Sequence, residues 1–195
     1  MRILGIDPGM TRCGVGVIDV DSARRLTLVS VDVITTPSGD PLAQRLMTLN
    51  EGIRAALEQF QPERFALERV FSQLNVRTVM SVAQVSGLAI VAAAERGIPV
   101  DLHTPSEVKA AVTGTGRATK QQVAGMVARL LGIDTAGMLP DATDALALAI
   151  TNAWRGGAGG LISGGEEEGL TSPQSSLTPA QQKWREAERL SRRRG

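Results

Sequence analysis

The sequence predicts an α/β fold with a mixed five-stranded sheet that starts with three antiparallel strands and continues through parallel crossovers. Strand-like apolar stretches at residues 3–7, 15–18 and 26–35 are separated only by short polar segments, which favours a meander. Two later strand-like stretches, 63–70 and 98–102, have a long helical stretch between them, which favours crossover connections. These two observations together predict the fold class.

Helices are expected to flank this sheet. The predicted helices span residues 41–60, 73–96, 105–112, 119–131 and 140–154. Thr104 and Glu107 have capping-box spacing before the third helix, and Gly132 closes the fourth. In the second helix the expected contact face combines Val79, Val82, Ala83, Gly87, Ile90 and Ala94. Such a face packs closely either on its own domain or on a second subunit.

The composition changes abruptly after residue 154, which predicts a domain over residues 1–154. Residues 155–195 begin as a Gly/Ser-rich linker and end in a basic tail. Trp184, Ala187 and Leu190 would form one stripe on a short helix there, and a disordered tail is the alternative.

Composition also limits the chemistry. No apolar run reaches the length of a membrane span, and the N-terminus lacks the layout of a signal peptide, so we expect a cytoplasmic protein without a membrane partner. A single cysteine, Cys13, excludes an internal disulfide and a cysteine-ligated zinc site. A single histidine, His103, disfavours Ser–His and Cys–His catalysis, and both residues are expected to be structural. The net charge of +1 neither indicates nor excludes a nucleic-acid partner.

Four acidic residues stand out by their positions. Asp7 ends the first strand, Glu68 lies near the end of the fourth, and Asp141 and Asp144 share one side of the first turn of the last helix. Each has an ordinary alternative: a solvated Asp–Pro turn, a surface glutamate, and acids that favour a helix N-terminus. The glycines Gly14 and Gly16 are expected to let a bulky group, such as a phosphate backbone, approach the hairpin.

The four positions become informative in combination. A crossover can place the fourth strand beside the first, and the apolar last helix must pack on the same sheet, so the four acids meet at one sheet edge. Without a matching set of lysines they would repel one another unless they held divalent cations. Oxygen-only ligands select Mg²⁺, with Mn²⁺ as a substitute. Two such ions about 4 Å apart would activate water for phosphodiester cleavage.

Four motifs carry a resemblance over residues 1–154. The segments ILGIDPG (3–9), ALERVF (66–71), VKAAVTGTGRATKQQV (108–123) and DATDALALAI (141–150) resemble the RuvC family of bacterial Holliday-junction resolvases, members of the RNase H-like superfamily. The resemblance implies an RNase H-like sheet and a two-metal site formed by Asp7, Glu68, Asp141 and Asp144; many relatives have His at the position of Asp141. It also implies a homodimer that nicks four-way junction DNA symmetrically and cooperates with the RuvA and RuvB branch-migration proteins.

DNA-contacting residues follow from the same resemblance. Phe71 resembles an aromatic residue that stacks on bases at the junction centre, and Lys109 and Lys120 resemble lysines that contact DNA. Arg69, Arg77 and Arg117 are expected to contact phosphates.

Three other interpretations remain open on the residues. Actin-like ATPases and sugar kinases begin with a similar strand and turn, but they need a second domain that the residues after 154 are too few to build. A junction-binding scaffold without catalysis is the second interpretation. The third is an RNase H-like nuclease that cuts another substrate, such as an RNA–DNA hybrid.

Overall fold

The computed structural model describes residues 1–69 and 76–155, and it has one mixed sheet within that part of the chain. The strands are β1 (Arg2–Asp7), β2 (Arg12–Val20), β3 (Leu26–Thr35), β4 (Arg64–Glu68) and β5 (Val100–His103). Their order is β3-β2-β1-β4-β5; the first three are antiparallel, whereas β4 and β5 run parallel to β1. The predicted fold class is therefore confirmed.

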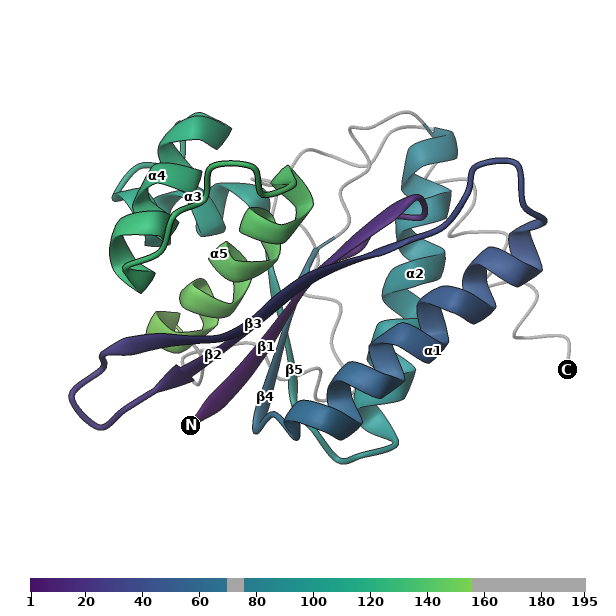
Figure 1. The fold of residues 1–195 in the computed structure, drawn as a ribbon, viewed down its shortest axis with the longest axis horizontal. Helices are drawn as coiled ribbons and strands as arrows, with labels where there is room; N and C mark the ends of the chain where they lie inside the picture. Colours follow the sequence, from purple (N-terminus) through teal and green to yellow (C-terminus); the bar gives the residue numbers. More distant parts are fainter. Residues whose placement is uncertain (70–75, 156–195) are drawn as a thin grey trace, which may run out of the picture. The chain divides into compact units, whose positions relative to one another are not determined.

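Five helices of the described residues cover the two faces of the sheet (Figure 1). On one face lie α1 (Leu42–Phe60) and α2 (Val76–Ala94); on the other lie α3 (Pro105–Thr113), α4 (Lys120–Leu131) and α5 (Pro140–Arg155). Thr104 caps α3 in the predicted capping box with Glu107, and Gly132 ends α4 in a left-handed conformation (φ 64°). Glycine adopts this conformation without steric cost, which explains the sharp helix end.

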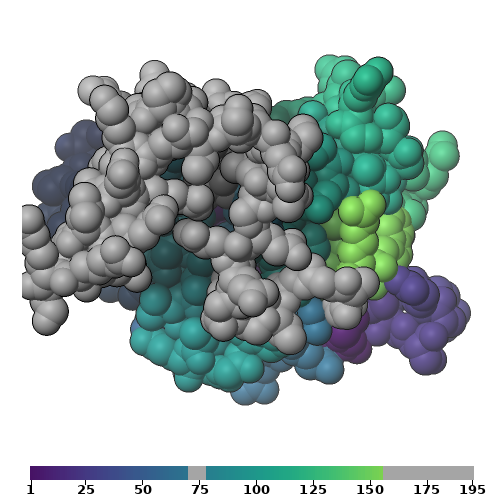
Figure 2. Space-filling view, turned by 180° about the vertical axis from the view of Figure 1, so that it is seen from behind, coloured from purple at the N-terminus to yellow at the C-terminus, as the bar shows by residue number. Residues whose placement is uncertain are grey.

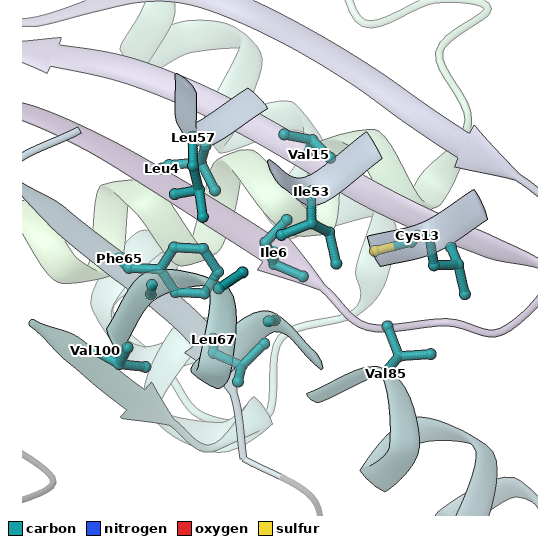
Figure 3. Close-up of a cluster of buried hydrophobic side chains, with 14 of the residues drawn as sticks. Leu4, Ile6, Cys13, Val15, Ile53, Leu57, Phe65, Leu67, Val85 and Val100 are labelled. Atoms are coloured by element: carbon teal, nitrogen blue, oxygen red, sulfur yellow. The ribbon is translucent and has the colours of Figure 1, made fainter. Parts of the chain in front are cut away.

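Alternate residues of the central strands build the core on the α1–α2 side. Figure 3 shows Leu4, Ile6, Phe65 and Leu67 gathered there with Val85 of α2. All five side chains are fully buried. Their burial fixes β1 and β4 at the centre of the sheet, so the ends of these two strands are held rigidly.

The predicted contact face of α2 does not pack as a whole on its own domain, although Ile90 does, and the alternative of a second subunit stays a prediction. The buried residues of this helix are Val85, Ser86, Ala89, Ala92 and Ala93, whereas Ala83, Gly87 and Ala94 are exposed. Because α2 is apolar nearly all round, its sequence periodicity does not identify the side that packs on the domain. The helix therefore presents a row of small and apolar residues to the surface.

Helix α5 is buried along almost its whole length and packs on the glycines of β1 and β2. A Cβ atom on Gly14 would lie 1.9 Å from the backbone oxygen of Asp141, and one on Gly5 would lie 2.3 Å from that of Ala145. A Cβ atom on Gly16 would be 2.8 Å from the backbone nitrogen of Leu146. The expectation that Gly14 and Gly16 admit a phosphate backbone is thus wrong: they admit a helix backbone.

The C-terminal end of α5 is held by the β2–β3 turn. Arg24, in the left-handed region with φ 61°, donates from Nη2 to the backbone oxygens of Ala153 and Trp154, both at 3.2 Å. Figure 2 shows this turn beside the last turns of α5 on the surface. The cap fixes α5 lengthwise, and with it the acids at its other end.

Several predictions fall on residues 70–75 and 156–195, which the structure does not describe. The linker and tail after residue 155, including the proposed stripe of Trp184, Ala187 and Leu190, lie outside the described residues, as does Phe71. The domain boundary at residue 154 stays a prediction. None of the described helices is long and apolar enough to cross a bilayer.

Candidate active site

The two strand acids lie side by side at one edge of the sheet. Asp7 is the last residue of β1 and Glu68 is the last residue of β4. These strands are parallel neighbours with Ile6 opposite Leu67, so the next residue of each strand emerges at the same edge. The predicted placement of the fourth strand beside the first is confirmed.

Helix α5 brings the other two acids to this edge. Asp141 lies in its first turn and Asp144 follows three residues later, beyond the predicted first turn. The contact between Gly14 and the Asp141 backbone presses this end of the helix against β2. Asp144 lines a cleft of about 650 Å³ together with Asp7 and Glu68. Asp141 lies beside this cleft and is not among the residues that line it. The structure thus brings three of the four acids into one cleft.

The cleft also carries positive charge. Lys109 of α3, Lys120 of α4 and Arg69, which follows β4, line it with the acids. These three residues were expected to contact DNA, and they face the same space as the acids. Arg117 is exposed on the loop after α3 and does not line the cleft. The side chain of Arg77 lies outside the described residues.

Burial and mutual repulsion make the strand acids hard to ionise. Burial raises the pKa of Asp7 to about 7, with further contributions from the charges of Glu68, Asp144 and Asp141. The pKa of Glu68 is also raised, first by burial and then by Asp144, against an opposing effect of Lys120 and Lys109. Asp7 and Glu68, which have no ion-pair partner among the described residues, are the acids most in need of a cation.

Each helix acid, in contrast, has a cation of the chain beside it. Nζ of Lys120 donates to Oδ2 of Asp144 at 2.7 Å, and this hydrogen bond raises the pKa of the lysine. Nε of Arg12 lies 2.8 Å from Oδ2 of Asp141. The expectation that the acids lack matching cations is therefore wrong for α5, because residues distant from it in the sequence supply two.

Arg12 is the site residue that the sequence analysis missed. It is the first residue of β2 and directly follows the turn after Asp7, so the hairpin returns it to the same edge of the sheet. That position in the hairpin was the available clue. Cys13 and His103 are both buried, as expected of structural residues, and burial raises the pKa of Cys13 to about 12.

The donor set fits a hard divalent cation. All four candidate ligands are carboxylates, and burial, followed by the neighbouring acids, raises the pKa of Asp7, a carboxylate that a divalent ion would stabilise in its ionised form. Within residues 1–69 and 76–155, no three His, Cys, Asp or Glu side chains stand close enough to hold an ion as they are placed. Binding an ion therefore requires side-chain rotations, and the contact of Lys120 with Oδ2 leaves Oδ1 of Asp144 for a ligand bond.

Comparison with known proteins identifies the family. The family described as crossover junction endodeoxyribonuclease RuvC matches residues 3–152. The chain belongs to the RuvC family. A RuvC of Leifsonia xyli is 56% identical over 99% of this chain and 94% of its own length, and one of Pseudarthrobacter chlorophenolicus is 54% identical over 99% and 98%. The family consists of metal-dependent nucleases, which leaves no support for the actin-like interpretation.

Two solved structures are similar to this chain. The chain is similar to Thermus thermophilus RuvC in complex with a Holliday junction substrate, with a TM-score of 0.74, 36% identity and coverage of 78% of this chain and 93% of that one. The yeast mitochondrial Holliday junction resolvase Ydc2, with a TM-score of 0.56 and 14% identity over 77% of this chain and 78% of its own, shares the fold. The predicted resemblance is confirmed.

Proposed function

We propose that this chain is an endonuclease that resolves four-way DNA junctions by paired symmetric nicks during recombination and repair in the cytoplasm. One observation carries the proposal: in a RuvC-family chain, Asp7, Glu68 and Asp144 line one cleft with Lys109 and Lys120. Carboxylates suit the hydrolysis of a phosphodiester, and the lysines suit the phosphates on either side of the cut.

Asp7, Glu68 and Asp144, with Asp141 beside them, would hold Mg²⁺, two ions per site, with Mn²⁺ as a substitute. When bound, such ions lower the pKa of water and stabilise the leaving oxygen of the phosphodiester. The side chains of the protein position the acids and contact the phosphate. The ends of β1 and β4 hold Asp7 and Glu68 in fixed positions, while Lys120, whose side chain is 76% exposed, can leave Asp144 for a phosphate.

The DNA path follows the charged rim of the cleft. Arg69 and Lys109 line the cleft together with the strand acids, and Arg117 extends the positive charge along the exposed loop after α3. Arg77 would contribute a further phosphate contact, and Phe71 would stack on the bases at the junction centre. The family resemblance further implies that RuvA and RuvB deliver the junction; retention of the chain on a RuvA–RuvB–junction complex would test this.

A homodimer would supply the second active site that paired nicks require. The surface that suits it is the exposed row of α2, formed by Met80, Ala83, Gly87, Val91 and Ala94. Met80 is 57% exposed and Val91 54%, and no atom lies within 4 Å of a Cβ built on Gly87, so a second helix backbone can come close. An apolar row with small residues at helical spacing is typical of a helix–helix interface.

Cleavage of a labelled synthetic four-way junction with Mg²⁺, beside a linear duplex and an RNA–DNA hybrid, tests the activity. Symmetric nicks confined to the junction are expected. Cleavage of the hybrid alone would overturn the junction as substrate and keep the fold and the metal site. Tight junction binding without any cleavage, in Mg²⁺ or Mn²⁺, would instead favour the scaffold.

Sedimentation velocity tests the dimer. Val91→Glu places a charge in the exposed row of α2 and is expected to convert the dimer to a monomer and to uncouple the two nicks. Leu139→Glu is the matched control, since Leu139 is 42% exposed on the loop before α5 and should leave the mass unchanged. A dimer that survives Val91→Glu would place the interface elsewhere.

A further inference from the structure

Arg12 and Asp141 form a pair at the rim of the cleft that the proposed reaction does not yet explain. Arg12 begins β2, at the sheet edge where Asp7 ends β1. Its side chain is 52% exposed, while that of Asp141 is 19% exposed. The pair therefore spans the boundary between solvent and the buried side of the site, and a ligand that arrives from solvent can reach the arginine first.

The contact between the two residues is incomplete. Nε of Arg12 lies 2.8 Å from Oδ2 of Asp141, yet that oxygen is buried and accepts no hydrogen bond from the described residues. A buried carboxylate oxygen without a hydrogen bond is costly, so Asp141 gains from any cation that ligates it directly. The pair is thus a close ion pair that lacks an aligned hydrogen bond at Oδ2 of Asp141.

The other end of the guanidinium is available. Within the described part of the chain, the Nη atoms of Arg12 donate no hydrogen bond, and the shortest contact of the ion pair is made by Nε. A guanidinium with two free donors matches the oxygens of a phosphate in a bidentate arrangement. Lys120 and Asp144 form a comparable ion pair and both line the cleft. That lysine already has a role in the proposed DNA path, whereas Arg12 has none.

We propose that Arg12 is a positioning residue that exchanges partners when DNA binds, an inference that rests on the proposed function. Without DNA, Arg12 holds Asp141 beside the cleft and competes with a divalent cation for its carboxylate. A DNA phosphate at the rim draws the guanidinium away, and Asp141 then turns toward Asp7 and joins the donor set. The metal site is thereby completed only when substrate is present.

Mn²⁺ binding in the absence of DNA tests the first half of this proposal, with the free ion followed by electron paramagnetic resonance. Arg12→Gln is expected to bind Mn²⁺ three- to tenfold more tightly than the wild type, because a competing cation is gone. The gain should vanish in the double variant with Asp141→Asn, since the two residues act on one another. Arg12→Lys keeps a competing charge and should bind like the wild type. Equal affinities for the wild type and Arg12→Gln would overturn the proposal.

Junction DNA tests the second half without any variant. With a junction whose scissile phosphates are replaced by uncleavable analogues, wild-type affinity for Mn²⁺ should rise to that of Arg12→Gln. In EDTA, Arg12→Gln should also lower the salt-dependence slope of junction binding by about one per protomer, which a purely structural ion pair would not do. An unchanged slope would overturn the exchange. Failure of the wild type to bind junctions would overturn the proposed function, while the DNA-free comparison would still decide what Arg12 does to Asp141.

Discussion

The strand acids and the helix acids of this site differ in how the fold treats their charge. Asp7 and Glu68 have no ion-pair partner within residues 1–69 and 76–155, and their pKa values are raised. Asp141 and Asp144 each have a cation of the chain beside them. The strand edge thus favours an external cation, while the helix acids are balanced until a metal ion competes for Asp141 and Asp144 or a phosphate competes for Arg12 and Lys120.

The largest expected effect is the loss of cleavage in Asp7→Asn. This change removes a central carboxylate from the cleft and should lower the rate of junction cleavage by at least about a thousandfold, equivalent to about 4 kcal/mol of activation free energy. Junction binding in Ca²⁺ should be retained. Asp32→Asn is the control, because Asp32 is exposed on β3 outside the cleft. Undiminished cleavage by Asp7→Asn would refute the assignment of the site.

The next effect concerns the distance between the two pairs of acids. Gly14→Ala would force a Cβ atom to within 1.9 Å of the Asp141 backbone oxygen, so α5 must move away from β2. We expect a loss of about 1–3 kcal/mol of folding stability and a fall in cleavage as the helix acids leave the strand acids. Gly39→Ala is the control, since nothing lies within 4 Å of a Cβ there. Unchanged denaturation by urea would show that α5 accommodates the methyl group.

A third effect follows from the pKa of Asp7, which is about 7 in the folded chain and near 4 when unfolded. Between these values the folded state holds a proton that the unfolded state has released, so this residue lowers stability as pH rises from about 4 to 7. Asn cannot ionise. In EDTA, the gain in Tm of Asp7→Asn over the wild type should therefore be several degrees larger at pH 8 than at pH 4.

Asp144→Asn sharpens this comparison. It removes the partner of Lys120 rather than an unpaired charge, so no comparable gain in Tm at pH 8 is expected. Equal gains in Tm at pH 8 for Asp7→Asn and Asp144→Asn would mean that ionised strand acids and helix acids lower folding stability to the same extent.

The smallest effect on folding stability is expected from Lys120→Met. The ion pair with Asp144 is largely exposed on the lysine side, so its loss should change stability by less than about 1 kcal/mol. Lys120 lowers the pKa values of Asp7 and Glu68, and its removal should raise them. The acid limb of the pH–rate profile for cleavage should then move to higher pH. A shift to lower pH would contradict this role.

The sequence by itself determined the elements and the acids. Period-two alternation placed residues 26–35 in a strand with the bounds that the structure has, and the capping box at Thr104 placed the start of α3. Asp7 and Glu68 could be predicted as neighbours because each ends an apolar run and a right-handed crossover brings parallel strands together. These features depend on local periodicity and on connection rules, which a single sequence contains.

Only the tertiary structure decided how the charges are arranged. The role of Gly14 and Gly16 depends on a helix more than 120 residues later, and the partners of Asp141 and Asp144 come from β2 and α4. The packed side of α2 could not be predicted from the sequence either, because this helix has apolar residues on several of its sides. Contacts with the rest of the domain determine that Val85 and Ala89 are buried. Contacts between distant segments are set by packing of the whole domain, and local patterns do not encode them.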